Sequence, residues 1–226
     1  MLLSLFKLLF FLALLLITWE DLSASLVFHR NNLLLRTILG LRLFLIPMAY
    51  WLGNPVFYFL LLLFQILPFA IHRKNFNGAS DYLCLLLLLA ICLSAFFPML
   101  SPYFHLYIFS QIVLSYLISG VLKAKQKTWW TGDALRHFVA SPKYYTPPKI
   151  KNFIQKNSKI FSRAVLFWEV SFPLAVFNLQ LLYFYLGVGI IFHLGNFFTF
   201  GLNRFFWLWI STYPLLLFFS SKLQLY

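Results

Sequence analysis

Long apolar segments limit what this chain can fold into. They cover residues 2–19, 37–52, 55–71, 82–100, 104–122, 164–182, 183–202 and 205–220. A helix needs about 20 residues, within a range of about 17–25, to cross a bilayer, so the shorter segments leave seven or eight spans. No strand-like alternation is visible, and helices satisfy their backbone hydrogen bonds in lipid. We therefore predict an all-α, polytopic integral membrane helical bundle.

The composition supports a membrane protein. Of the 226 residues, 62% are hydrophobic, whereas soluble domains are about 45–50% apolar. No internal repeat is evident, so we expect a single domain over residues 1–226. We also expect the first apolar segment to remain as a helix rather than to be cleaved as a signal peptide, because later segments already require a membrane.

Ten of the eighteen basic residues lie in one polar stretch, residues 123–163, which we call the basic segment. The net charge of +13 is explained by basic loops facing the cytoplasm and by anionic lipid headgroups, so we expect no nucleic acid partner. Short helices are predicted over 132–139 and 149–162. The second is basic and amphipathic, and we expect it to lie along the headgroups.

Lys123 ends a stripe of polar residues. Gln111, Ser115, Ser119 and Lys123 recur at intervals of four, with Tyr116 beside them. Two interpretations stay open. The small residues can ease helix packing while Lys123 reaches the membrane interface. Alternatively, partial burial favours the neutral amine of Lys123 and makes it a general base.

Two more ionisable residues lie inside apolar segments, where placing a charged side chain in the membrane costs free energy. Glu169 either pairs near the surface with Arg163 or faces the bundle interior and pairs with a cation such as His193. His193 shares a helical face with Asn196. We expect either a packed core histidine or a site there.

Motifs of other chemistries are absent from the sequence. Cys84 and Cys92 form no CxxC pair, and there is no HExxH motif, paired carboxylate, phosphate loop or nucleophile elbow. We therefore expect no metal site.

Residues 111–134, QIVLSYLISGVLKAKQKTWWTGDA, resemble the vitamin K-dependent gamma-carboxylases and their bacterial relatives, the HTTM (horizontally transferred transmembrane) domain proteins. The shared pattern is an apolar helix with Gly and then Lys, followed by Trp and a Gly-x-Ala turn. Residues 188–214 are similar to the family's Phe-His helix, with an asparagine three residues after His193. Residues 167–173 fit the acidic position between the two, and Arg36 suits the family's early arginine helix.

The resemblance implies an enzyme, a carboxylase- or epoxidase-like lyase. Lys123 would deprotonate a reduced quinone such as vitamin K hydroquinone, which then reacts with oxygen. His193 and Glu169 would act beside Lys123 as catalytic residues, and Asn196 would bind substrate. Trp129 and Tyr116 complete the expected substrate-binding set. The family chemistry faces the secretory lumen, whereas the charge pattern places Lys123 on the cytoplasmic side.

A non-catalytic role is the alternative. The chain ends at Tyr226, without the long C-terminal region that captures the peptide in the animal carboxylase, so we do not expect peptide carboxylation. The protein would then be a component for the maturation, export or immunity of a small peptide. Its partners would be membrane lipids and a small peptide or another membrane protein. Either way we expect a bacterial inner-membrane protein.

Overall fold

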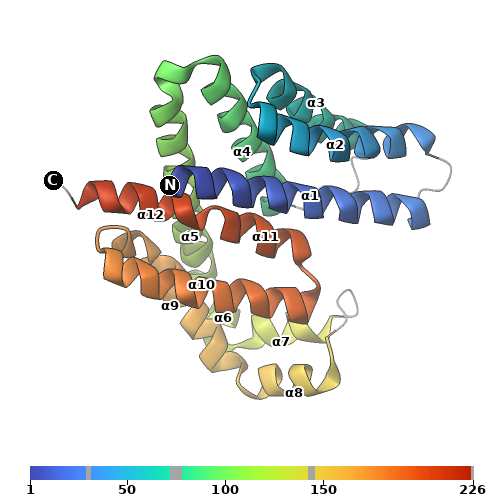
Figure 1. Cartoon of the computed structure of the whole chain (residues 1–226). Helices are drawn as coiled ribbons and strands as arrows, with labels where there is room; N and C mark the ends of the chain where they lie inside the picture. Colours follow the sequence, from blue (N-terminus) through green and yellow to red (C-terminus); the bar gives the residue numbers. More distant parts are fainter. Residues whose placement is uncertain (29–31, 72–77, 142–145, 225–226) are drawn as a thin grey trace. The chain divides into compact units, whose positions relative to one another are not determined.

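A computed structural model describes residues 1–28, 32–71, 78–141 and 146–224, and within these ranges the secondary structure is entirely helical. The elements of Figure 1 are α1 (Leu2–Phe28), α2 (Leu33–Leu52), α3 (Pro55–Ile71), α4 (Ala79–Phe96), η2 (Pro98–Leu100), α5 (Ser101–Ala124), α6 (Lys127–Thr131), α7 (Asp133–Ala140), α8 (Pro148–Lys156), α9 (Ser158–Ala175), α10 (Leu179–Phe200), α11 (Asn203–Ser211) and α12 (Tyr213–Leu223). The predicted all-α class is confirmed.

Five helical stretches in the described residues are long and apolar enough to cross a membrane. They are α1, α2, α4, α10 and the continuous stretch of η2 with α5. Helix α3 is apolar but shorter. These helices are compatible with an integral membrane protein, and the expected seven or eight spans stay a prediction.

The chain divides into two compact units. Unit 1 is Met1–Ile108 with Trp207–Pro214, and unit 2 is Phe109–Phe206 with Leu215–Tyr226. Helices α5, α11 and α12 contribute residues to both. The single domain over residues 1–226 therefore stays a prediction.

In unit 1, consecutive helices pack on each other: α1 on α2, α2 on α3, and α3 on α4. Gly53 ends α2 with a left-handed φ of 64° and donates its N–H to the carbonyl of Ala49. This closure allows α3 to begin two residues later and to return beside α2. The core contains fully buried apolar side chains from the four helices, including Phe10, Ile46 and Leu87.

In unit 2, α9 is the central element, because α6, α7, α8 and α10 all pack against it. Three expected segments are shorter in the structure. The basic helix predicted over 149–162 breaks at Asn157, whose side chain bonds the carbonyl of Phe153. The apolar segment expected over 164–182 is interrupted at Asn178. This residue caps α10, because its side-chain oxygen accepts a hydrogen bond from the Leu181 N–H. The segment over 205–220 breaks at Thr212, before Pro214.

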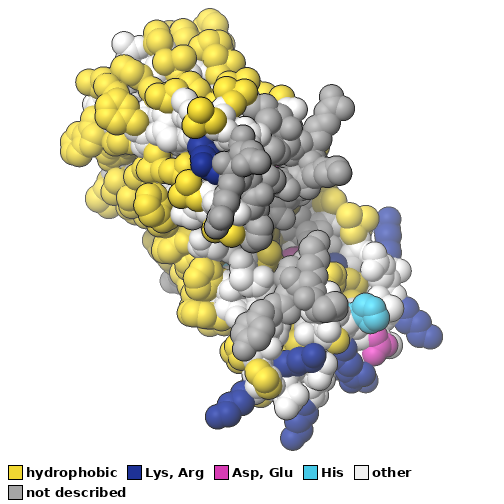
Figure 2. Space-filling model, turned by 90° about the vertical axis from the view of Figure 1, so that its right-hand side faces the viewer, with side chains coloured by type: hydrophobic (Ala, Val, Ile, Leu, Met, Phe, Trp, Pro, Cys, Tyr) yellow, Lys and Arg dark blue, Asp and Glu magenta, His cyan; other side chains and the backbone are white. Residues whose placement is uncertain are grey.

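The basic segment is part of unit 2, and its helices pack on one another. Gly132, between α6 and α7, has a φ of 85°, and a Cβ there would lie 2.5 Å from the backbone nitrogen of Lys159. Arg136 Nε donates to the buried Ser158 hydroxyl at 2.8 Å, and Arg163 Nε donates to the carbonyl of Trp130 at 3.0 Å. Several basic residues remain exposed, and Figure 2 shows lysine and arginine side chains gathered at its lower end. Tyr144 and Tyr145, which as aromatic residues of the basic segment are expected to anchor it at the membrane interface, lie outside the described residues.

Candidate functional site

A buried ion pair joins α5 to α9. The Lys123 ammonium lies 2.5 Å from each carboxylate oxygen of Glu169, and it also donates to the Ser119 hydroxyl at 2.7 Å. The side chain of Lys123 is 18% exposed and that of Glu169 is 5% exposed. Glu169 therefore faces the interior of unit 2, as one of the two interpretations predicted. Its partner is Lys123, and neither Arg163 nor His193 takes that place.

Gly120 brings the two helices close enough for this pair. A Cβ on Gly120 would lie 2.7 Å from the backbone nitrogen of Val170 and 2.8 Å from its side chain. A residue larger than glycine at position 120 would push α5 away from α9 beside Val170, which directly follows Glu169. Lys123 lies three residues after Gly120, so this contact determines how far the ammonium is from the carboxylate.

Lys123 also contacts an aromatic ring. Its ammonium lies 5.1 Å from the centre of the Trp129 ring, which α6 supplies. A cation over an indole face is attracted by the ring's quadrupole. Lys123 is thus held by a carboxylate on one helix and by an indole on another, so both the position and the charge of its ammonium are constrained.

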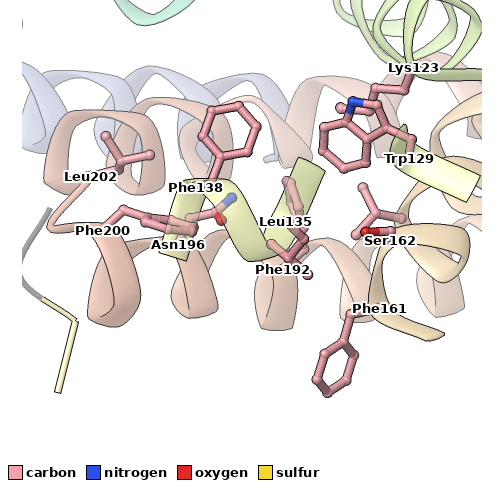
Figure 3. A pocket seen from close by; sticks show the side chains of 11 residues that line it. Lys123, Trp129, Leu135, Phe138, Phe161, Ser162, Phe192, Asn196, Phe200 and Leu202 are labelled. Atoms are coloured by element: carbon pink, nitrogen blue, oxygen red, sulfur yellow. The ribbon is translucent and has the colours of Figure 1, made fainter. Parts of the chain in front are cut away.

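Lys123 and Trp129 line a cavity of about 240 Å³ in unit 2 (Figure 3). Two further polar residues, Ser162 and Asn196, line it. The rest of the wall is apolar and consists of Leu135, Phe138, Phe161, Val165, Phe192, Phe200 and Leu202. In the view of Figure 3, Lys123 and Trp129 lie at one side of the cavity and Asn196 at the other. The cavity therefore suits a largely apolar ligand with a few polar groups.

Ser162 is a functional candidate that the sequence did not single out. Its side chain is fully buried, and within the described part of the chain its hydroxyl has no hydrogen-bond partner. Ser162 and Glu169 are seven residues apart, which is two helical turns, so they share a face of α9. Phe192, Asn196 and Phe200 likewise recur at intervals of four on α10. This spacing in the sequence could have identified these residues as part of the cavity wall.

A hydrogen bond joins Tyr116 to His193. Tyr116 Oη lies 3.0 Å from His193 Nε2, and both residues are buried. Tyr116 also stacks on Phe172, and Trp168 packs against both Tyr116 and His193. Neither residue lines the cavity. The structure thus brings Lys123, Trp129 and Asn196 to the cavity and pairs Glu169 with Lys123, whereas His193 and Tyr116 form a separate buried cluster.

The described residues contain no group of three or more His, Cys, Asp or Glu side chains that could hold a metal ion. No protein-family model matches this chain, and no curated protein or solved structure matches it.

Proposed function

We propose that unit 2 of this membrane protein binds an amphiphilic ring compound in its cavity, and that Lys123 accepts a proton from that ligand. One observation carries the proposal. The Lys123 ammonium lines an apolar cavity while a buried carboxylate holds it in place. The ligand class that we propose is a reduced quinone such as vitamin K hydroquinone, in line with the resemblance of residues 111–134 and 188–214. The proposed location is a bacterial inner membrane.

The cavity walls suit such a ligand. Flat aromatic and branched side chains, including Trp129 and Phe192, offer the stacking surface that a ring needs. A hydroquinone carries hydroxyl groups at opposite edges of its ring. Lys123 can meet one of them and the Asn196 amide the other, because these residues lie at different sides of the cavity (Figure 3). The Ser162 hydroxyl offers a further polar contact.

The ion pair supports the proton step. Two opposite charges removed from water carry a large desolvation cost, so transfer of a proton from the ammonium to the carboxylate leaves a neutral pair that burial tolerates better. The Lys123 amine then has a lone pair, and it takes the proton of a ligand hydroxyl. The products are the ligand's oxyanion and the Lys123 ammonium group, which form an ion pair beside the protonated Glu169. We propose a structural role for His193, because its hydrogen bond to Tyr116 helps to pack α10 against α5.

Ligand binding tests the cavity. We would measure the binding of vitamin K hydroquinone to the purified protein in lipid nanodiscs under anaerobic conditions. Ser162→Leu adds an apolar side chain to the cavity wall and should abolish binding. Ser171→Leu is the matched control, because Ser171 lies on α9 but does not line the cavity. Equal affinity for wild type and Ser162→Leu would contradict the proposal.

One surface supports the second candidate, a non-catalytic component for a small peptide. Lys149 and Lys156 on α8 are exposed, and so are the neighbouring apolar side chains of Phe153 and Ile160, at 60% and 68%. A basic surface with exposed apolar side chains suits an anionic lipid surface or an acidic peptide. Reversal of Lys149 and Lys156 to glutamate should then release a bound peptide while hydroquinone binding remains. Retention of the peptide would exclude this role for α8.

A further inference from the structure

A second cavity, of about 360 Å³, lies in unit 1. Its lining comes from the start of α1, the turn after α2, the start of α3, the end of α4 and the start of α5. These helix ends lie together, because consecutive helices of the unit run in alternating directions. Helices α1, α2 and α4 are long enough to cross a membrane. The cavity is therefore expected at the depth where the lipid headgroups begin.

The cation in this cavity is Lys7. Its ammonium donates to the Tyr58 hydroxyl at 2.5 Å and lies 4.9 Å from the centre of the Tyr58 ring. No carboxylate forms an ion pair with Lys7 among the described residues, which include all five acidic residues of the chain. Glu20, on the same helix, is thirteen residues away, or about 20 Å along the axis. The charge of Lys7 is thus not balanced by an acid of the protein.

Further polar groups surround Lys7. His105 Nδ1 lies 2.8 Å from the carbonyl of Ser101, and since a carbonyl only accepts, Nδ1 carries a proton and Nε2 is the other ring nitrogen that can face a ligand. The Ser94 hydroxyl is shielded from solvent and has no hydrogen-bond partner in the described part of the chain. Ser4 also lines the cavity. The cavity thus combines one uncompensated cation with several neutral polar groups.

We infer that this cavity binds a phosphate group. Phosphate oxygens are strong acceptors and pair well with an ammonium group. The space is sufficient, because a phosphate group has only five heavy atoms, and the cavity volume of about 360 Å³ is many times the roughly 10–15 Å³ that one water molecule needs. Lys7 supplies the charge, and Tyr58, Ser94 and His105 lie where they can contact the remaining oxygens. The apolar part of the wall, Leu3, Phe6 and Ile91, suits the first carbons of an acyl chain.

Two sources can supply this group, a phospholipid headgroup or free phosphate. We would measure binding to the full-length protein in neutral detergent by native mass spectrometry with three probes: phosphatidylglycerol, diacylglycerol with the same chains, and inorganic phosphate. Phosphatidylglycerol should bind and diacylglycerol should not. Displacement of the lipid by millimolar inorganic phosphate would identify free phosphate as an equivalent ligand, and no displacement would identify the headgroup. Equal binding of diacylglycerol and phosphatidylglycerol would overturn the inference.

Two variants locate the binding. Lys7→Gln keeps a donor for Tyr58 but removes the charge, and it should weaken phosphatidylglycerol binding about tenfold or more. Lys222→Gln is the control, because Lys222 is an exposed lysine near the end of α12 that packs on Phe218. Unchanged binding in Lys7→Gln would contradict the inference, and so would an equal loss in Lys222→Gln.

A labelling measurement needs no substitution. Phosphatidylglycerol should slow the reaction of Lys7 with an amine-reactive reagent in the wild-type protein, while the reaction of Lys222 stays unchanged. Peptide mass spectrometry reads both sites in one sample. Equal labelling of Lys7 with and without the lipid would contradict the inference even if Lys7→Gln failed to fold. Neither experiment depends on Lys123 or on the unit 2 cavity.

Discussion

The Lys123 ammonium lies 2.5 Å from both carboxylate oxygens of Glu169, although the two residues are 46 positions apart in the chain. This pair joins the end of α5 to the middle of α9, and Lys123 lines the unit 2 cavity at the same time. One side chain thus connects the packing of unit 2 with its candidate chemistry.

Breaking the ion pair should destabilise the protein strongly. Glu169→Gln removes the charge that balances Lys123, and an uncompensated buried charge costs about 3–5 kcal/mol of unfolding free energy. The double variant Lys123→Met with Glu169→Leu should recover much of this loss, because it leaves no buried charge. Thermal unfolding in detergent, followed by circular dichroism, measures both effects.

The exposed pair of Arg136 with Asp133, at 3.2 Å, is the control. Asp133→Asn should change the stability little, because exposed ion pairs contribute little in water. If Glu169→Gln were as harmless as Asp133→Asn, the pair would not be a buried interaction.

Gly120→Val should separate α5 from α9. The new side chain would overlap with Val170, and overpacking of this kind costs about 1–3 kcal/mol or more. The same substitution should weaken hydroquinone binding, since it displaces Lys123. Gly187 on α10 is the matched control, because a Cβ there meets no atom within 4 Å. Gly187→Val should leave binding unchanged, and an equal loss in both variants would contradict the role given to Gly120.

Several parts of the fold were predictable from the sequence. The apolar segment expected over residues 55–71 is α3, Pro55–Ile71, because a proline starts it and polar residues follow it in the sequence. For the stripe from Gln111 to Lys123, the sequence left open whether Lys123 reaches the membrane interface or is partly buried. Sequence reasoning left the partner of Glu169 open, because that choice depends on which residues of α5 and α9 meet. The contact at Gly120 decides this, and it joins residues about 50 positions apart.

Other features of the fold depended on where helices end, and the hydrophobic periodicity of the sequence does not reveal these ends. The expected basic helix over 149–162 ran through Asn157, but α8 ends before Asn157, whose side chain donates a hydrogen bond to the carbonyl of Phe153. Ser158 and Ser162 then belong to α9, which places Ser162 in the cavity wall rather than on a membrane surface. The division into two units was also not expected, because three helices contribute to both.

Removal of the Tyr116 hydroxyl should have a modest effect on the stability of the protein. Tyr116→Phe loses the hydrogen bond to His193 but keeps the ring that packs on Phe172, so we expect a loss of about 1 kcal/mol in unfolding free energy. Tyr107→Phe on the same helix is the control, because Tyr107 is 53% exposed. Hydroquinone affinity should be the same in both variants, since Tyr116 does not line the cavity. A selective loss of affinity in Tyr116→Phe would show that Tyr116 contacts the ligand, as the sequence resemblance implied.

Hydroquinone-dependent oxygen uptake tests the role of Lys123 most directly. We would measure it for wild type, Lys123→Met and Lys125→Met in nanodiscs, with variant stability checked by thermal unfolding. Lys125 is exposed and lies two residues from Lys123, which makes it a matched control. We predict that wild type and Lys125→Met consume oxygen and that Lys123→Met is slower by about a hundredfold or more, as expected for loss of a general base. No uptake by wild type, or equal rates for Lys123→Met and Lys125→Met, would contradict the assignment of Lys123 as the base.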